Sequence, residues 1–365
     1  MKFRCERDTL ADAIASAGRA VTSRGGALPV LSGLKVTAGT GTVELVGSDL
    51  ELTIRTTVPA DVDSDGTAVV PARLFGEIVR NLEPGPVTIS VADEDAHIEA
   101  ARSSFSVRLL PAGDFPPLAP VEGASATLDA GALVEALRQV VPAASRDDAR
   151  PILTGVLLAA TRQGLRLVAT DSYRLAVRDL AGVSMLSEGQ QVLVAAKALA
   201  EVQRLLSEGE ISVTLSGRDV SFTHGTAEVS TRLIEGDFPN YEQLIPSGYP
   251  NRLTVGRDVL DAAVKRVRLV SQGRDTAPVR MAMSADRLEL SAIAQEVGEA
   301  REVLEAKYEG SDLTVAFNPE FLLDGIHALA GEEVVLETID PLKPATLRAV
   351  DDPDFLYLLM PVRIS

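Results

Sequence analysis

The sequence predicts an α+β fold of three similar domains, each built from antiparallel sheets with two helices. Two observations predict it. Landmarks recur in the same order at a spacing of about 120 residues, which is the size of one small domain. Within each copy, apolar residues alternate between helical spacing and the two-residue period of strands.

The recurrence is clearest between the first two copies. Gly-Asp-Phe-Pro begins at Gly113 and again at Gly236, PVLSGL at Pro29 returns as PILTGV at Pro151, and GSDLELTIR at Gly47 returns as ATDSYRLAVR at Ala169. VPARLFGEIVRNL from Val70 likewise returns as VAAKALAEVQRLL from Val194, and fainter copies, APVRMAM from Ala277 and VAFNPEFLLDGIHAL from Val315, follow. We therefore expect domains at residues 1–120, 121–249 and 250–365, with linkers around Pro116–Ala124 and Pro246–Pro250.

Each repeat has the same expected order of elements. A short strand precedes a helical segment, as in repeat one, where Leu10, Ala13, Ile14, Ala17 and Val21 share a face. Alternating strands such as 43–58 and 165–180 follow, then a second helix after VPAR, VAAK or VAFN, then strands such as 211–224. Short turns between the strands favour antiparallel sheets.

Composition limits the class of protein. With 46% hydrophobic and 24% charged residues, the chain reads as an ordinary globular protein. The N-terminus MKFRCERDTL lacks the apolar stretch of a signal peptide, and no run of 18 apolar residues occurs. A single cysteine, Cys5, excludes an intramolecular disulfide, so we expect a cytoplasmic protein.

Catalytic chemistry is not indicated. The three histidines, His97, His224 and His327, have no second ligand at metal-binding spacing, and Gly39–Gly41 lacks the Lys and helix of a phosphate loop. The aspartates of the repeated motifs are those of turns and bulges, and a triplicated carboxylate is structural: Asp49, Asp114, Asp171 and Asp237. We expect no enzyme activity, no metal and no cofactor.

The landmarks together resemble the bacterial DNA sliding clamp, the beta subunit of DNA polymerase III. The matching stretches span the chain in order: MKFRCERDTL, LPVLSGL, SDLELTIR, VPARLF, LLPAGDFP, ATDSYRLAV, LIEGDFPNY, AFNPEFLLD and LLMPVRI. The resemblance implies the DNA clamp fold and a ring-forming homodimer of two head-to-tail protomers. Such a ring encircles duplex DNA, slides on it and tethers DNA polymerase III, the clamp loader and other DNA replication and repair proteins without chemistry of its own.

Geometry and charge agree with this implication. Twelve helices of roughly 10 Å width, side by side, leave an opening of roughly 28 Å, wide enough for a hydrated duplex. The net charge is −17, yet the expected helical segments 7–24, 71–82, 129–146, 195–206, 257–274 and 318–329 sum to +4. An acidic protein would thus present a mildly basic lining. The candidate DNA contacts are Arg24, Arg73, Arg80, Arg138, Arg146, Arg150, Lys197, Arg204, Lys265, Arg266 and Arg268.

The resemblance also implies two protein interfaces. The dimer contact would join Arg102, Phe105, Val107 and Arg108 of one protomer to Leu269, Val270, Glu299 and Glu302 of the other. A pocket for partner peptides between repeats two and three would use Leu153, Thr170, Ser172, Tyr173, Arg174, Leu175, Pro239, Leu244, Asn318, Phe321, Leu342, Leu358, Leu359, Met360, Pro361, Val362 and Arg363. Ser172-Tyr173 replaces the family's Gly-His pair, and Pro319, Pro341 and Pro344 are further departures.

Two alternatives stay open at this point. The chain could be a β-rich scaffold protein with no role on DNA, which the negative charge favours slightly. It could also be a second clamp copy whose altered pocket protects its host from a clamp-directed inhibitor.

Overall fold

The computed structural model describes residues 1–365 except 23–27, 207, 272–276, 295–296 and 364–365. The chain divides into two compact units. The first comprises Met1–Gly131 with Ala198–Leu233, and the second comprises Ala132–Lys197 with Ile234–Ser365. In the described part of the chain, no helix is long and apolar enough to cross a membrane.

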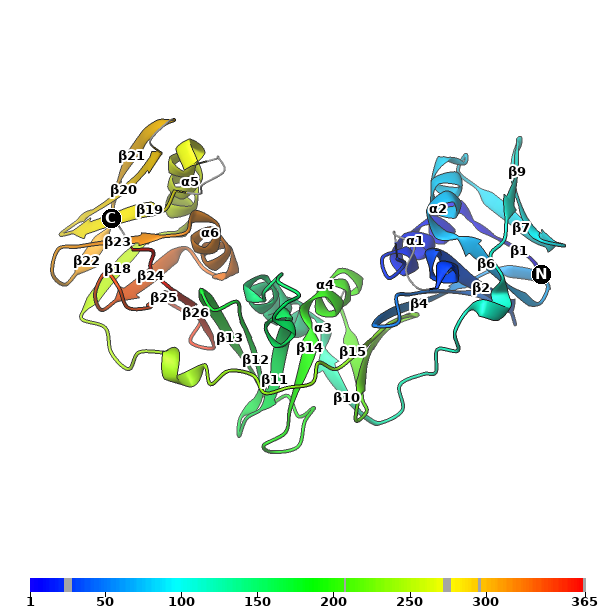
Figure 1. Cartoon of the computed structure of the whole chain (residues 1–365), viewed down its shortest axis with the longest axis horizontal. Coiled ribbons are helices and arrows are strands. Elements are labelled where there is room, and N and C mark those ends of the chain that lie inside the picture. Colours follow the sequence, from blue (N-terminus) through cyan, green and yellow to red (C-terminus); the bar gives the residue numbers. More distant parts are fainter. Residues whose placement is uncertain (23–27, 207, 272–276, 295–296, 364–365) are drawn as a thin grey trace. The chain divides into compact units, whose positions relative to one another are not determined.

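The first unit contains two antiparallel sheets (Figure 1). In spatial order the smaller sheet comprises β5 (Asp61–Ser64), β1 (Lys2–Glu6), β7 (Pro86–Ala92), β8 (Asp95–Ala100) and β9 (Ser103–Arg108). The larger comprises β10 (Ala124–Asp129), β15 (Glu210–Leu215), β16 (Asp219–His224), β17 (Ala227–Arg232), β4 (Leu52–Pro59), β3 (Thr42–Ser48), β2 (Gly33–Gly39) and β6 (Gly66–Pro71). The pairing of β17 with β4 therefore joins repeats one and two in one continuous sheet.

The second unit repeats this plan. Its nine-stranded sheet comprises β14 (Gln191–Ala195), β11 (Gly155–Ala160), β12 (Gly164–Thr170), β13 (Arg174–Ala181), β26 (Phe355–Leu359), β25 (Ala345–Ala349), β24 (Glu333–Thr338), β18 (Asn251–Gly256) and β22 (Lys307–Glu309). The four-stranded sheet comprises β21 (Gly298–Glu305), β20 (Arg287–Ala294), β19 (Val279–Ser284) and β23 (Leu313–Phe317). Here β13 pairs with β26, so repeats two and three also share one sheet.

Six α-helices occur among the described residues, two in each repeat as expected. They are α1 (Arg7–Gly18), α2 (Ala72–Asn81), α3 (Ala130–Val140), α4 (Ala196–Leu205), α5 (Arg257–Val267) and α6 (Pro319–Ala328). Short 3-10 turns lie at η1 (Pro29–Ser32), η2 (Ala112–Asp114), η3 (Val141–Ala143), η4 (Pro151–Thr154), η5 (Glu242–Leu244) and η6 (Arg268–Ser271). Helices α1, α3 and α5 end earlier than expected; α3, for example, stops before Pro142, which has no N–H to continue it.

The helices and strands of repeat one pack around an apolar core. In repeat one, Leu10 and Ile14 of α1 and Phe75 of α2 meet Phe3 and Leu45 from the strands. Gly47 is required there because a Cβ atom would lie 2.1 Å from the carbonyl oxygen of Ala17. The antiparallel sheets and paired helices confirm the predicted fold class.

Candidate functional site

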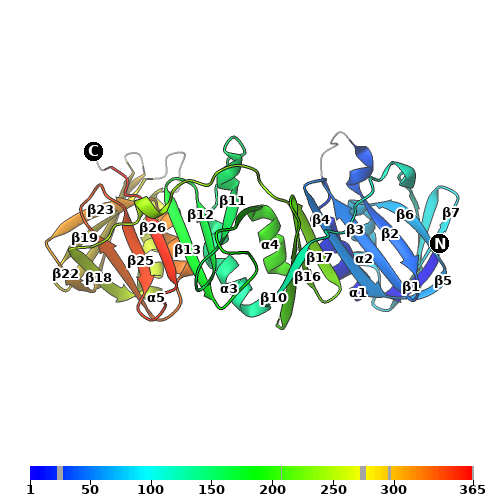
Figure 2. The ribbon, with the colours of Figure 1, turned by 90° about the horizontal axis from the view of Figure 1, so that it is seen from below.

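An apolar cluster covers part of one face of the nine-stranded sheet in the second unit, on β14, β11, β12, β13 and β26. Leu175 of β13 pairs in register with Leu358 of β26, and both are buried in this cluster. The segment after Leu233 crosses the same face, where Figure 2 shows it running over β11, β12 and β13. Its side chains Phe238 and Tyr241 pack on the cluster, and half-buried Met360 lies at the cluster's edge.

Because side chains alternate along a strand, the expected pocket residues on β26 point to two different faces of the sheet. Leu356, Leu358 and Met360 face the apolar cluster, whereas Leu359 faces the other side of the sheet and is fully buried. The expectation that Leu359 lines the same pocket as Leu358 is therefore wrong, because neighbouring strand residues point to opposite faces. Arg174 pairs in register with Leu359 and lies on that second, helix-covered face.

The turn from Thr170 to Arg174 is fixed by its own hydrogen bonds. Asp171 Oδ1 accepts from the backbone N–H groups of Tyr173 (2.9 Å) and Arg174 (3.1 Å). The Thr170 hydroxyl donates to the Arg174 carbonyl at 2.6 Å. Ser172 takes a left-handed conformation with φ of 80°, and Tyr173 follows with 59% of its surface exposed. The Met360 N–H donates to the Tyr173 carbonyl at 2.8 Å, which ties the turn to the end of β26.

Arg174 occupies the centre of a charged network on the helix side. Its Nε lies 3.0 Å from Asp171 Oδ2, and its NH1 group donates to Asp324 of α6 and, at 3.4 Å, to the Tyr357 hydroxyl. Its guanidinium lies 4.3 Å from the ring centre of Phe321. Burial raises the pKa of the Tyr357 phenol, so this hydroxyl stays protonated and donates to the Phe321 carbonyl at 2.9 Å.

Tyr173 and Phe321 form an aromatic wall beside this network. Their ring centres are 6.3 Å apart with an interplanar angle of 27°. A cavity of ≈ 440 Å³ adjoins the wall, bounded by the 144–150 loop on one side and by Glu320 and Asp324 of α6 on the other. Arg150 crosses its rim, with Nε 3.0 Å from Asp147 Oδ2 and NH1 3.4 Å from Ser172 Oγ.

The remaining expected pocket residues are placed around these two groups. Leu244, Val362 and Leu342 are exposed by 47%, 37% and 63% respectively. Leu153 is buried in η4, its carbonyl accepting from the Ser145 N–H. Asn318 caps α6 by accepting from the Glu320 N–H at 2.9 Å. Pro361 is half-buried, and Pro239 and Arg363 are exposed.

Sequence reasoning missed several residues of this site. Ile152, Ile245, Phe238 and Tyr241 pack on the apolar cluster, and Asp324 and Tyr357 hold Arg174. Pattern signals existed for Phe238 in the repeated Gly-Asp-Phe-Pro motif, for Ile152 in the repeated PILTGV, and for Tyr357 between Leu356 and Leu358 on one strand. No spacing rule relates Asp324 to an arginine 150 positions away.

The expected DNA contacts that the structure describes lie on helices, in the 144–150 loop and in η6, and most have an acidic neighbour. Ion pairs are formed by Arg73 with Glu77, Arg138 with Glu135, Arg150 with Asp147, Arg204 with Glu201, Lys265 with Asp261 and Arg266 with Glu302. Arg80, Arg146 and Lys197 are exposed and Arg268 is half-buried. Arg24 lies outside the described residues. The helical surface is thus only weakly cationic.

The residues expected at a dimer contact lie on or beside the edge strand β9, on the edge strand β21 and in η6. Strand β9 is the last strand of the five-stranded sheet, with Phe105 40% exposed and Arg102 and Arg108 also exposed. Val107 is 3% exposed and belongs to the core of repeat one, so the expectation that its side chain faces a partner is wrong. Phe105 and Val107 point to the same face of β9, but Val107, opposite Ala96, is covered by the core of repeat one, whereas Phe105, opposite Ile98, stays exposed.

Strand β21 is the corresponding edge of the four-stranded sheet. Glu299 is exposed, whereas Glu302 already pairs with Arg266 at 2.5 Å within the chain. Leu269 is 59% exposed and Val270 is half-buried. Exposed apolar residues that sequence reasoning missed, Ile293, Val297 and Val303, lie on the same pair of strands or their connecting turn.

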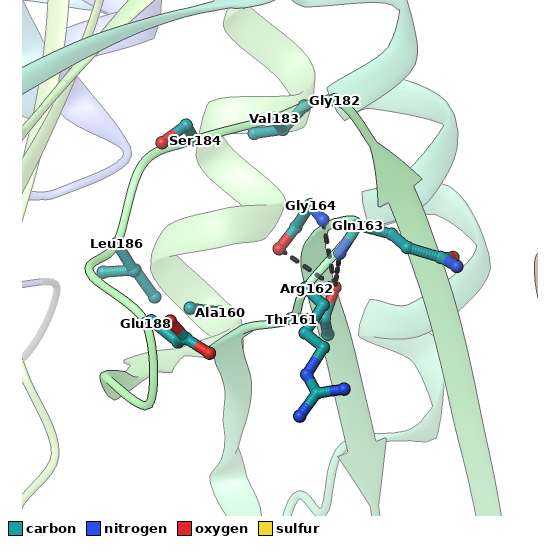
Figure 3. Close-up of a pocket in the computed structure, with 10 residues that line it drawn as sticks. All are labelled: Ala160, Thr161, Arg162, Gln163, Gly164, Gly182, Val183, Ser184, Leu186 and Glu188. Atoms are coloured by element: carbon teal, nitrogen blue, oxygen red, sulfur yellow. Dashed lines mark hydrogen bonds between the residues drawn. The ribbon is translucent and has the colours of Figure 1, made fainter.

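A second hollow lies at the opposite end of the repeat-two strands (Figure 3). It has a volume of ≈ 400 Å³ and lies between the 160–164 turn and the 182–188 segment. Thr161 fixes the turn by accepting from the Gly164 N–H at 3.0 Å. The charged side chains of its lining are Glu188 and Arg162. Across the described residues, no group of three or more His, Cys, Asp or Glu side chains could hold a metal ion.

Three copies of an α+β unit joined through continuous sheets, with two helices per copy, define the DNA clamp fold. Three domain descriptions of the DNA polymerase III beta subunit match this chain: the N-terminal domain over residues 1–119, the central domain over 127–240 and the C-terminal domain over 242–363. The chain belongs to the DNA polymerase III beta subunit family, the bacterial beta sliding clamps.

Individual relatives agree over the full length. The beta sliding clamp of Streptomyces coelicolor is 36% identical, with 100% of each chain covered. The sliding clamp of Bartonella birtlesii, solved bound to griselimycin, is 30% identical with a TM-score of 0.93 and 100% of each chain covered. The C. crescentus clamp, solved with PEG bound, is 31% identical with a TM-score of 0.92, covering 100% of this chain and 99% of that one. The chain is accordingly a processivity factor of DNA replication and a non-catalytic subunit, and nothing in these similarities supports a scaffold unrelated to DNA or a specialised second copy.

Proposed function

We propose that two copies of the chain close head-to-tail into a cytoplasmic ring around duplex DNA. The edge strands β9 and β21 support this, because each leaves one row of backbone groups unpaired within its own sheet and each carries exposed apolar side chains. Arg102 and Arg108, at the two ends of β9, face acidic Glu299 and Glu302 on β21 of the other copy. The boundaries 1–120, 121–249 and 250–365 remain the proposed domains.

The ring slides because its contacts with DNA are weak. The cationic side chains of the helices are largely paired with acids on the same chain, so phosphate must compete for them. Contacts of this kind position a duplex without reading its sequence. Neither metal nor nucleotide is required by the protein itself.

A groove at the joint between repeats two and three receives the linear peptides of partners. Those partners are the catalytic subunit of DNA polymerase III, the clamp loader and other proteins with a clamp-binding motif. Leu175, Leu358 and Met360 supply the apolar floor, and the exposed Leu244 and Val362 lie beside it. Met360 adapts to different anchors because its side chain is unbranched and flexible.

The observation that carries this assignment is an internal comparison. The joint between repeats one and two has the same strand pairing, β4 with β17, but polar residues stand at the equivalent positions. Thr53 replaces Leu175, Ser230 replaces Leu358 and Arg232 replaces Met360. One fold thus offers an apolar floor at one joint and a polar surface at the other. The ligands bound to the Bartonella birtlesii and C. crescentus relatives show that clamps of this family bind small molecules, which is consistent with a ligand groove here.

The assignment is tested by titrating a labelled clamp-binding peptide from the polymerase. We expect Met360→Arg, which copies the first joint, to weaken binding at least tenfold, since a charge replaces the apolar contact. Arg232→Ala at the equivalent position is the matched control and should bind as the wild type. Deleting residues 360–365 should abolish binding. If wild type, Met360→Arg and the deletion variant bind the peptide with equal affinity, the groove does not lie at this joint.

A further inference from the structure

We infer that Asp324 is a positioning residue for partner binding, acting through Arg174 on the aromatic wall of Tyr173 and Phe321. This inference rests on the proposed peptide groove. Asp324 lies on the helix side of the sheet and is 40% exposed at its side chain, whereas Arg174 beneath it is 7% exposed. Asp324 itself is therefore not part of the apolar floor.

The contacts define how the effect is transmitted. Asp324 binds NH1 of Arg174, and the same guanidinium lies 4.3 Å from the centre of the Phe321 ring. The orientation of a guanidinium is set by its carboxylate partners, because its donors are fixed in one plane. The Tyr357 hydroxyl adds a second restraint by bonding both Arg174 (3.4 Å) and the Phe321 carbonyl (2.9 Å). Phe321 in turn stacks on the exposed ring of Tyr173.

The joint between repeats one and two has a comparable ion pair between a helix acid and an arginine, without the aromatic wall. Glu201 of α4 lies 123 positions before Asp324, is buried, and binds Arg19 of the preceding repeat at 2.5 Å. A helix acid therefore reaches back to an arginine of the preceding repeat at both joints. Among the described residues, only the arginine at the second joint lies against an aromatic ring, because α6 has Phe321 where α4, 123 positions earlier, has Ala198.

The test compares Asp324→Asn with Asp352→Asn. Asp352 also joins β13 to repeat three, through two contacts of 2.7 and 2.6 Å to Arg178, but it contacts neither Arg174 nor the wall. We expect Asp324→Asn to weaken binding of the labelled polymerase peptide about fivefold to tenfold, the size of one weakened charged hydrogen bond. Asp352→Asn and Glu201→Gln should each stay within about twofold of wild type, even where they lower thermal stability.

A double-mutant cycle separates positioning from direct contact. In a Phe321→Leu background, Asp324→Asn should change the peptide Kd by less than about twofold, because the ring through which it acts is gone. If the fivefold to tenfold loss persists in that background, or if Asp324→Asn binds as the wild type, the positioning role is refuted. Should Asp324→Asn fail to fold, Tyr357→Phe replaces it, with an expected loss of about threefold that also requires Phe321. Failure of Met360→Arg to weaken binding would instead refute the groove itself.

Discussion

Leu50 in repeat one and Ser172 in repeat two hold the same left-handed backbone conformation, with φ of 77° and 80°. Each follows an aspartate whose Oδ1 accepts two backbone N–H groups, from Glu51 and Leu52 in one case and from Tyr173 and Arg174 in the other. The internal repeat therefore extends to individual hydrogen bonds. What differs is the side chains that the common turn presents, and this difference distinguishes the two joints.

The two turns give a matched prediction about stability. Asp49→Ala should cost about 1 kcal/mol, because it leaves two backbone N–H groups without their acceptor near solvent. Asp171→Ala should cost about 2–3 kcal/mol more, since it also removes a partner of buried Arg174 at 3.0 Å. Urea denaturation of both variants measures the difference. Equal costs would show that the Asp171–Arg174 pair adds nothing to the turn.

The architecture could be predicted from the sequence because it depends on periodicity. The apolar stripe of Leu10, Ala13, Ile14 and Ala17 became the buried face of α1, and the repeated motifs predicted three copies of one unit. Sheet continuity across the joints could not be predicted this way. It depends on which edge strand pairs with which, as β13 does with β26, and no local pattern encodes that choice.

The site could also be predicted only in part, because it depends on which face a strand residue points to and on which distant segments meet in the fold. The resemblance implies pocket residues by their position in the sequence, so it includes neighbours such as Leu358 and Leu359 together. In a strand the side chains of such neighbours point to opposite faces. Val107 and Phe105 were also included together; they share a face of β9, but the core of repeat one covers only Val107. The network around Arg174 depends on side chains from three distant segments, so only the folded chain shows that Asp324 belongs to it.

A second prediction concerns the close packing of α6 on β26. A Cβ atom at Gly325 would lie 2.7 Å from the ring of Tyr357, so Gly325→Ala should destabilise the protein by about 1–3 kcal/mol. Gly18 is the control, because it also lies in a helix but a Cβ atom there would have no neighbour within 4 Å. Gly18→Ala should be neutral or stabilising by up to about 1 kcal/mol. Thermal unfolding of both variants tests this, and similar Tm values would contradict it.

A third prediction concerns pH. The hydrogen bond from Arg266 lowers the pKa of Glu302 below its ordinary value of 4.5, against the opposing effect of burial. Since the folded state favours the ionised carboxylate, the stabilisation is fully present above that ordinary value and is lost as pH falls through the lowered pKa. Wild type should be more stable than Glu302→Gln at pH 7, and the gap should shrink as pH falls below 4.5 toward the lowered pKa. A gap that stays constant in urea denaturation between pH 3 and pH 7 would contradict this assignment.

A fourth prediction concerns the dimer contact. Arg102→Glu combined with Arg108→Glu should yield monomers in analytical ultracentrifugation, because like charges would then meet across the interface. A variant carrying Glu299→Arg and Glu302→Arg should also be monomeric, because like charges would again meet across the interface. In a mixed ring one contact joins the two charge-reversed patches and the other joins two unchanged patches, so we expect mixing the variants to restore the dimer. An undisturbed dimer after reversal at Arg102 and Arg108 would place the interface elsewhere.

A fifth prediction concerns DNA contact by Arg24 and Arg150. Replacing both with Ala should weaken DNA binding to the same extent for every sequence. It should also reduce the slope of log K against log salt by about 1–2, roughly 0.9 for each lost phosphate contact. Arg287→Ala on β20 is the control and should leave the slope unchanged. Unchanged loading and sliding of the double variant at every salt concentration would exclude both side chains as contacts.

Retention on DNA of defined topology tests the central claim most directly. The protein is loaded onto nicked circular DNA with a clamp loader and isolated by gel filtration, and the DNA is then cut once with a restriction enzyme. A closed ring that holds DNA by topology should remain on the intact circle and leave within minutes of linearisation, with no dependence on sequence. Equal dissociation rates from circular and linear DNA would show that the protein binds the duplex directly and does not encircle it.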